Sequence, residues 1–291
     1  MMQRPLMHGL GLAALSQLSG RYDRLFCDIW GVVHNGVDQV PSAVAALNSF
    51  RATGGQVALI SNAPRPSSFV RQTLTRMGIP NAAYDCVVTS GDVTQSLIAE
   101  FRGQTICHVG PAYDRNLFDG TGVLFGPAEA AEVLVVLDLD EKGEAIEDYA
   151  GDIERWKALG LRMICANPDR MVEIGDRIIL CGGALADAYH EAGGEIIMAG
   201  KPYAPIYDLA RQRLADAGLP EVGSDRTLAI GDSVRTDAAG ARAQGADFLF
   251  VTGSIHAAEL HEDGSEADDR MVRDLVAPSG ANLIGYMRNL V

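Results

Sequence analysis

Short apolar runs alternate along the chain with longer stretches in which apolar residues recur three or four positions apart. The mostly apolar runs Leu25–Cys27 and Gln56–Ile60 indicate strands that are covered on both faces. The stretch Pro41–Thr53 has the three-residue spacing of a helix, and Gly54 directly after it is a common helix end. These patterns predict a strand, a helix and a second strand in succession.

The same succession continues in the rest of the chain. It predicts strands at 86–88, 227–230 and 247–251, and helices at 66–77, 93–101 and 236–244. Apolar strands that alternate with helices form a parallel sheet with helices on both faces. We therefore expect a doubly wound, Rossmann-like α/β core.

The middle of the chain has strand and helix patterns of its own. Strands are expected at 133–137, 161–165 and 178–180, and helices at 149–159 and 183–191. This is too much structure for a connecting loop. We predict a core formed by residues 1–102 and 196–291, with a second α/β domain inserted at residues 103–195.

The N-terminal 20 residues carry leucines at spacings that suit an amphipathic helix, namely Leu12, Leu15 and Leu18. The apolar stretch Leu10–Leu15 is too short for a signal peptide, and no apolar run in the chain approaches the length of a membrane span. We expect a short helix here and no membrane partner.

Charge and cysteine content restrict the partners and the compartment. The 291 residues include 38 acidic and 24 basic ones, which gives a net charge of −14. Such a surface repels nucleic acid, so we expect no nucleic-acid partner. The five cysteines are widely spaced and form no CxxC pair, which is typical of reduced thiols in a cytoplasmic protein. The sequence is compatible with a homo-oligomer.

Carboxylates follow two of the predicted strands directly. Asp28 follows the first strand, and Asp232 and Asp237 lie five apart after the strand at 227–230. Chemistry in open parallel sheets gathers at the carboxyl ends of the strands. A carboxylate at a strand end is often only a cap, but three at neighbouring ends would suit a hard divalent cation.

Two further polar segments lie at predicted strand ends or before helices. Ser61 and Asn62 follow the second strand, where a hydroxyl group and backbone amides could hold a phosphate oxygen. Lys201 lies between a glycine and a proline ahead of a helix. Each segment alone is ordinary turn or surface chemistry. Arg65 and Arg235 flank these segments and could contact a substrate.

Taken in this order, the four segments resemble those of the haloacid dehalogenase-like (HAD) hydrolase superfamily. Residues 165–169, Cys-Ala-Asn-Pro-Asp, and the later Gly182–Leu185 resemble the cap domain of its class IIA, NagD-like group. The resemblance implies an HAD core with an inserted class IIA cap. It also implies a phosphatase of small phosphorylated metabolites that requires Mg²⁺.

The resemblance assigns a role to each candidate residue. Asp28 is the expected nucleophile and forms an aspartyl-phosphate, which replaces one difficult displacement by two easier ones. The expected Mg²⁺ ligands are Asp28, the backbone carbonyl of Trp30, Asp232 and Asp237. The expected phosphate ligands are Ser61, the Asn62 amide and Lys201. In the cap, Asn167 and Asp169 are expected to act in substrate specificity.

Trp30 departs from the family pattern. Family phosphatases carry a second aspartate two residues after the nucleophile, as the general acid and base. An indole cannot exchange a proton at neutral pH, and the loss of such a group costs a factor of about 10² to 10⁴ in rate. His34 is a candidate replacement, because its ring titrates near neutrality. The sequence therefore predicts a slow phosphatase.

Two other functions fit the same residues. One is a catalytically weakened binding or regulatory protein that keeps the metal and phosphate site, which Trp30 favours. The other is carbon–halogen hydrolysis, which needs neither a metal nor a second aspartate. Asp232 and Asp237 argue against this last function, because a metal-free site has little use for clustered carboxylates.

Overall fold

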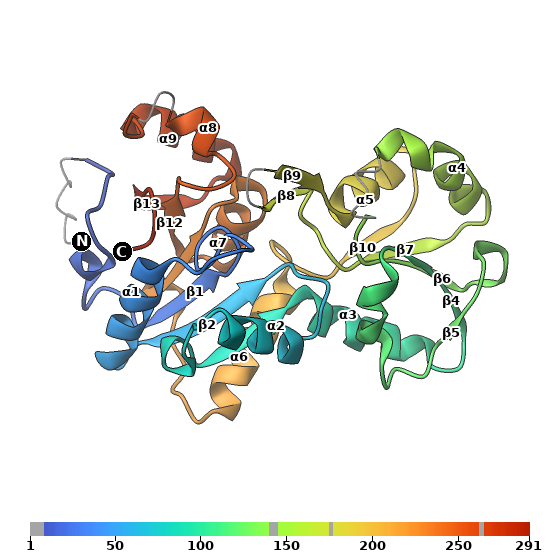
Figure 1. Cartoon of the computed structure of the whole chain (residues 1–291), viewed down its shortest axis with the longest axis horizontal. Helices are drawn as coiled ribbons and strands as arrows, with labels where there is room; N and C mark the ends of the chain where they lie inside the picture. Colours follow the sequence, from blue (N-terminus) through green and yellow to red (C-terminus); the bar gives the residue numbers. More distant parts are fainter. Residues whose placement is uncertain (1–8, 140–144, 175–176, 262–264) are drawn as a thin grey trace.

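The computed structural model describes residues 9–139, 145–174, 177–261 and 265–291. Two separate parallel sheets, each flanked by helices, lie side by side along the long axis of the molecule (Figure 1). The first sheet is built from both ends of the chain and the second from its middle. The predicted α/β architecture with an inserted second unit is therefore present.

The first sheet has six strands in the order β13-β12-β11-β1-β2-β3, and every neighbouring pair is parallel. Its strands are β1 (Arg24–Asp28), β2 (Gln56–Ser61), β3 (Cys86–Thr89), β11 (Thr227–Gly231), β12 (Asp247–Val251) and β13 (Asn282–Met287). The chain order reverses on either side of β1, which lies between β11 and β2. The carboxyl end of β1 is therefore a switch point of the kind where such sheets bind ligands.

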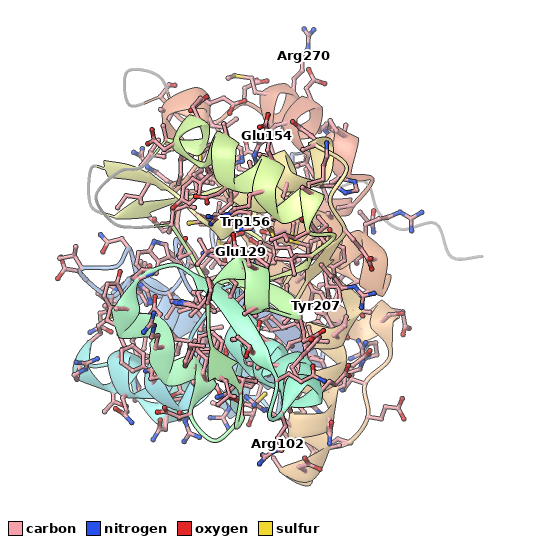
Figure 2. All side chains as sticks on the ribbon, turned by 90° about the vertical axis from the view of Figure 1, so that its right-hand side faces the viewer. Arg102, Glu129, Glu154, Trp156, Tyr207 and Arg270 are labelled. Atoms are coloured by element: carbon pink, nitrogen blue, oxygen red, sulfur yellow. The ribbon has the colours of Figure 1, made fainter. Side chains whose placement is uncertain are left out.

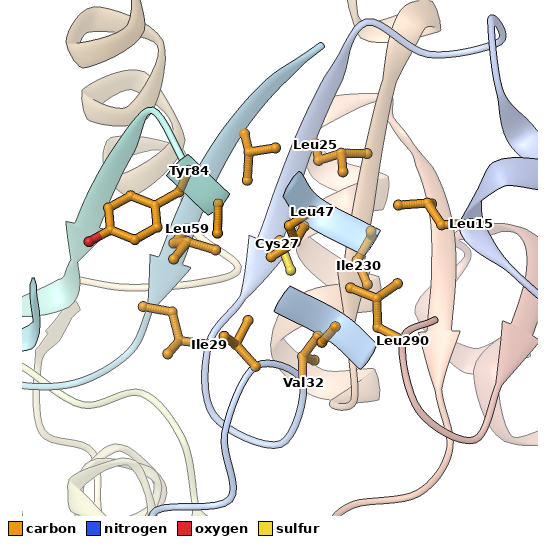
Figure 3. Close-up of a cluster of buried hydrophobic side chains, with 14 of the residues drawn as sticks. Leu15, Leu25, Cys27, Ile29, Val32, Leu47, Leu59, Tyr84, Ile230 and Leu290 are labelled. Carbon is orange, nitrogen blue, oxygen red and sulfur yellow. The ribbon is translucent and has the colours of Figure 1, made fainter. Parts of the chain in front are cut away.

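Helices cover both faces of this sheet, as the unbroken apolar strands predict. Leu25 and Cys27 of β1 face a core formed with α1 (Pro41–Ala52) and α2 (Ser67–Arg76) (Figure 3). Phe26 between them faces the other side of the sheet. The helices of that side are α3 (Ser90–Ile98), α6 (Ala204–Asp216), α7 (Ala239–Gln244), α8 (Ala257–Leu260) and α9 (Asp269–Val276).

The second sheet has five parallel strands in the order β10-β7-β6-β4-β5. Its strands are β4 (Thr105–Val109), β5 (Leu124–Phe125), β6 (Val133–Val136), β7 (Arg162–Cys165) and β10 (Ile196–Met198). Helices α4 (Ala150–Ala158) and α5 (Gly182–Glu191) cover one face. In Figure 2, Trp156 of α4 belongs to this buried core, whereas Glu154 of the same helix is exposed.

A two-stranded antiparallel hairpin follows β7. It consists of β8 (Met171–Ile174) and β9 (Arg177–Leu180) and lies between the two sheets in Figure 1. The sequence pattern predicted β9 but missed β8. It also missed β10, which pairs with β7 and so extends the second sheet to Met198. We propose that the inserted domain ends after this strand rather than at residue 195.

The predicted N-terminal helix is wrong except for one 3₁₀ turn at Leu15–Leu18. Before that turn the chain runs beside β13, where the amide of Leu12 donates to the carbonyl of Tyr286 at 2.9 Å and the amide of Tyr286 donates to the carbonyl of Leu10 at 2.9 Å. The leucine spacing arises because these side chains are buried against the sheet, not because they share one helix face. Residues 1–8 lie outside the described part of the chain.

The sequence pattern also missed β4, β5 and β13. Other differences concern helix ends. The helix expected at 236–244 begins as a π-helical turn, Val234–Ala238, and continues as α7. The helix expected at 93–101 starts earlier, at Ser90, because Thr89 caps it by accepting a hydrogen bond from the amide of Asp92 at 3.1 Å. No helix in the described part of the chain is both long enough and apolar enough to cross a membrane.

Candidate active site

The nucleophile predicted from the sequence lies at the centre of the larger sheet. Asp28 is the last residue of β1, at the carboxyl edge of the sheet, and is only 8% exposed. One of its oxygens, Oδ1, accepts a hydrogen bond from the amide of Ile29 at 2.7 Å. The side chain is thereby fixed at the carboxyl end of the strand.

Two glycines make room for the other carboxylates. Gly31 has a φ of +80°, and a Cβ atom there would lie 2.0 Å from Oδ2 of Asp232. A Cβ on Gly231, the last residue of β11, would lie 2.1 Å from Cγ of Asp237. Any side chain at either position would displace a carboxylate. Glycine at position 31 therefore lets the loop after β1 approach Asp232, and glycine at position 231 lets the loop after β11 fold back over its own strand end.

The structure brings Asp28, Asp232 and Asp237 together as predicted. Oxygen atoms of the three buried carboxylates lie within 4.8 Å of one another. Such a group of hard oxygen ligands is what Mg²⁺ prefers in proteins, so the residues present fit a divalent cation. The position of the Trp30 carbonyl as a further ligand remains a prediction.

Lys201 joins this group from the start of the segment that leads into α6. Its Nζ lies 2.7 Å from Oδ1 of Asp28 and 2.7 Å from Oδ1 of Asp237, and the residue is only 3% exposed. One ammonium thus balances part of the charge of three carboxylates. The site keeps an excess of negative charge that a divalent cation would offset.

Burial and mutual repulsion shift the titration of the cluster. Burial, followed by repulsion from Asp237, raises the pKa of Asp28 well above its usual value, although Lys201 opposes this. The same two causes raise the pKa of Asp232 to about 7. Burial lowers the pKa of Lys201, but attraction to Asp237 and Asp28 outweighs it and raises that pKa well above 10.5. Lys201 is therefore charged at neutral pH.

Ser61 and Asn62 lie at the end of β2, next to β1. The hydroxyl of Ser61 accepts a hydrogen bond from the amide of Ala63 at 3.2 Å. The side chain of Asn62 binds the lysine segment: its Oδ1 accepts from the amide of Lys201 at 2.7 Å, and its Nδ2 donates to the carbonyl of Lys201 at 3.3 Å. A Cβ on Gly200 would lie 2.2 Å from that Oδ1. The sequence pattern indicated a backbone role for Asn62 and missed this side-chain role.

One of the two predicted cap residues, Asp169, contacts the site from the second sheet. Asn167 and Asp169 follow β7, and Oδ1 of Asp169 accepts a hydrogen bond from Nδ2 of Asn62 at 3.0 Å. The loop after β7 that carries Asn167 and Asp169, the cap loop, is therefore hydrogen-bonded directly to Asn62, which binds the Lys201 main chain. Whether these residues also select substrates remains a prediction.

The surroundings of Trp30 disfavour His34 as a replacement acid and base. The two rings meet edge to face with centroids 5.0 Å apart, and Nδ1 of His34 accepts a hydrogen bond from the amide of Gly36 at 3.0 Å. Burial lowers the pKa of His34 to about 4, so it is neutral at pH 7. Its ring acts as packing for Trp30 and has no proton to supply as imidazolium.

The two flanking arginines connect the two parts of the molecule. Nε of Arg65 lies 2.5 Å from Oδ1 of Asp114, which precedes β5. Nη2 of Arg235 lies 2.9 Å from Oδ2 of Asp187 on α5. Both guanidinium groups therefore pair with carboxylates of the second unit.

The comparisons with known proteins agree with the fold. Residues 25–124 match the family described as haloacid dehalogenase-like hydrolase, and residues 198–278 match the related HAD-hydrolase-like family. The chain is similar to the crystal structure of a haloacid dehalogenase-like hydrolase from Brucella suis 1330, with 40% identity and a TM-score of 0.83. The match covers 96% of this chain and 99% of that one. This chain therefore belongs to the haloacid dehalogenase-like hydrolase family.

Two more distant relatives are also similar to the chain. NagD from Escherichia coli K-12 has the same fold, with 18% identity and a TM-score of 0.63 over 92% of this chain and 96% of NagD. The curated 5'-nucleotidase YutF of Bacillus subtilis is 22% identical over 258 residues, 87% of this chain and 96% of its own length. The expected class IIA, NagD-like fold is confirmed.

Proposed function

We propose that this hydrolase is a Mg²⁺-dependent phosphatase of small phosphomonoesters, with Asp28 as its nucleophile. The observation that carries the proposal is the buried contact of Lys201 with Asp28 beside Asp232 and Asp237. A nucleophilic carboxylate, a charged lysine and a carboxylate group suited to a cation are the parts that phosphoryl transfer needs. Similarity to a 5'-nucleotidase supports the same class of substrate.

The residues of the site would share the work as follows. Asp28 attacks the phosphorus atom, the ester oxygen leaves, and water then hydrolyses the aspartyl-phosphate. Ser61, the backbone amide of Asn62 and the Lys201 ammonium bind the phosphoryl oxygens and stabilise their charge in the transition state. Asp28, Asp232, Asp237 and the Trp30 carbonyl would hold Mg²⁺, which supplies neutralisation of the crowded anions and in-line orientation when bound.

Trp30 makes this phosphatase slow on poor leaving groups. With no carboxyl group two residues after Asp28, the departing oxygen leaves unprotonated and the attacking water has no base at that position. The same feature favours the second candidate function, a weakened binding or regulatory protein that retains the metal and phosphate site. Turnover separates the two functions.

The decisive experiment is phosphate release from a panel of phosphomonoesters, including an activated aryl phosphate, with and without Mg²⁺. The phosphatase proposal expects Mg²⁺-dependent release from at least the aryl phosphate, and loss of release in the Asp28→Asn variant. If the panel is inert but inorganic phosphate and Mg²⁺ still bind, the binding-protein function is correct. If neither binds, both proposals fail.

The amino-acid composition supports a class of substrate and a cellular compartment. An acidic surface favours small phosphorylated metabolites over nucleic acid. All five cysteines are free thiols in the structure. Reduced thiols suit a cytoplasmic location, which we propose for this enzyme.

A further inference from the structure

Asp138 is a carboxylate of the second sheet that has no role in the proposed reaction. It lies two residues beyond β6, at the carboxyl edge of that sheet. Its Oδ1 accepts hydrogen bonds from the amides of Leu139 and Gly182, each at 3.0 Å. Its Oδ2 accepts from Nδ2 of Asn167 at 3.1 Å. Both oxygens therefore face donors, which is the arrangement of an ionised carboxylate.

Asn167 transmits this contact to the cap loop. With its Nδ2 fixed by Asp138, its Oδ1 accepts a hydrogen bond from the amide of Asp169 at 3.2 Å. The loop also packs tightly on α5, because a Cβ on Gly183 would lie 2.3 Å from the carbonyl oxygen of Pro168. The Asp169 main chain therefore has little freedom as long as Asp138 accepts from Asn167.

The chain of contacts continues into the first sheet. Oδ1 of Asp169 accepts from Nδ2 of Asn62 at 3.0 Å, and Oδ1 of Asn62 accepts from the amide of Lys201 at 2.7 Å. An amide side chain that donates at one end and accepts at the other can satisfy both contacts in only one orientation. The orientation of Asn62, and with it the placement of Lys201, therefore depends on the Asp169 carboxylate.

We propose that Asp138 is a positioning residue that holds Lys201 in place through Asn167, Asp169 and Asn62. The inference rests on the proposed phosphatase function and deepens it. The cap loop then acts on the phosphoryl group itself and not only on the leaving group. Removal of one of these hydrogen bonds should lower kcat/KM by the same factor on every substrate, because all phosphomonoesters share the phosphoryl group.

In the contact between Asn167 and Asp138, the amide donates and the carboxylate accepts. Exchange of the two residues therefore gives a matched rescue experiment. Asp138→Asn places an amide donor opposite the Asn167 amide donor, and Asn167→Asp places a carboxylate opposite the Asp138 carboxylate. The double variant restores one donor and one acceptor: Oδ1 of the new asparagine still accepts from Leu139 and Gly182, and its Nδ2 donates to the new aspartate. The double variant also keeps the net charge of the wild type.

The measurements are kcat/KM on an aryl phosphate and on an alkyl or nucleoside phosphate, with inhibition by inorganic phosphate as a second readout. Each single variant should lose about tenfold to 10²-fold in kcat/KM, by the same factor on every substrate, and should bind inorganic phosphate more weakly. The double variant should recover most of both losses. Asp152→Asn, which removes a partly exposed carboxylate of α4 paired with Arg155, is the control and should change neither.

A second pair of variants tests the middle of the chain of contacts if the Asp138 variants fail to fold. Asp169→Asn keeps an oxygen that accepts from Asn62 and should retain most activity. Asp169→Ala removes it and should lose activity equally on all substrates. A loss confined to some substrates, or single variants with wild-type kinetics, would overturn the inference. An inactive wild type that does not bind phosphate would instead refute the proposed function.

Discussion

The carboxyl edges of the two sheets share a local sequence pattern, an aspartate at the end of an apolar strand, but the two aspartates have different surroundings. In each sheet an apolar strand leads to a buried or half-buried aspartate: Asp28 is the last residue of β1, and Asp138 lies two residues beyond β6. Asp138 is surrounded by amide donors, which satisfy its oxygens and fix it. Asp28 instead lies beside a lysine and two more carboxylates.

The comparison indicates that the neighbours of a carboxylate at a strand end, rather than its position in the sequence, distinguish the proposed nucleophile from an anchoring residue. Amide donors contact both oxygens of Asp138, so it serves as an anchor. The partners around Asp28 are charged groups instead: Lys201, which also contacts Asp237, and the expected cation. Variants at one edge or the other should separate these two roles, and the largest expected effect comes first.

The largest effect should come from the nucleophile. Asp28→Asn should reduce phosphate release by about 10⁴-fold or more, because no neighbouring group can take over the attack on phosphorus. The thermal midpoint of the variant should not fall, since a neutral amide relieves repulsion from Asp237. Residual activity above about 1% of the wild-type rate would contradict this role.

Lys201→Met should affect rate and stability together. Activity on an aryl phosphate should fall by about 10²-fold to 10³-fold, because one donor to the developing charge is lost. The free energy of unfolding should fall by about 3 kcal/mol, because removal of one partner leaves buried carboxylates uncompensated. Chemical denaturation measures this loss, and Mg²⁺ should restore part of it.

Trp30→Asp should change the dependence on the leaving group. The wild type should cleave an activated aryl phosphate and scarcely any alkyl phosphate. The variant should gain about 10²-fold or more on alkyl phosphates by restoring a proton donor. The variant must first be shown to fold, because a partly buried carboxylate there is costly. A folded, Mg²⁺-binding variant without this gain would favour the binding-protein function.

Mg²⁺ should stabilise the wild type against heat. The gain is about 2.7 kcal/mol at a concentration 100 times the dissociation constant, because the ligands converge only in the folded chain. Asp232→Asn should remove the shift with little change in the midpoint of the metal-free protein. Differential scanning fluorimetry at millimolar Mg²⁺ measures both, and a wild type without a shift would refute the metal site.

The last prediction concerns the pH dependence of stability at the carboxyl edge of the second sheet. Burial raises the pKa of Asp138 to about 7, with Asp114 adding to the increase, and its buried neighbours include the Cys165 and Cys181 thiols. A carboxyl group with a raised pKa favours the folded state below about pH 4, and this contribution is lost as the pH rises through about 7. The difference in unfolding free energy, wild type minus Asp138→Asn, should therefore decrease from about pH 4 to about pH 7.5. A flat difference would mean that the pKa of Asp138 is not raised.

The sequence could predict the parts of the site that strand ends determine. Asp28 and Asp232 follow apolar strands that pair with each other, so the rule for parallel sheets is enough to bring them together. The same rule applied to Val133–Leu137 could have indicated Asp138. The α/β core, with its alternating strands and helices, was predictable for the same reason.

The contacts between the two units could not be read from the pattern. Asn62 lies 107 residues from Asp169 and 139 from Lys201, and an asparagine after a strand is common turn chemistry. Its role depends on how the cap loop reaches the core, which no local spacing encodes. The N-terminal segment is similar, because its leucines fit a helix locally but its backbone pairs with β13 from the other end of the chain.

The central claim is that Asp28 carries the phosphoryl group during turnover, and the missing base at position 30 makes this intermediate accumulate. The most direct measurement is rapid acid quenching of the Mg²⁺-loaded enzyme with an activated aryl phosphate, followed by peptide mass spectrometry. The account predicts the mass increment of one phosphoryl group on the peptide that contains Asp28, together with a burst of aryl alcohol close to one equivalent per active site. Turnover with no modified peptide and no burst, or a phosphoryl group on another residue, would contradict it.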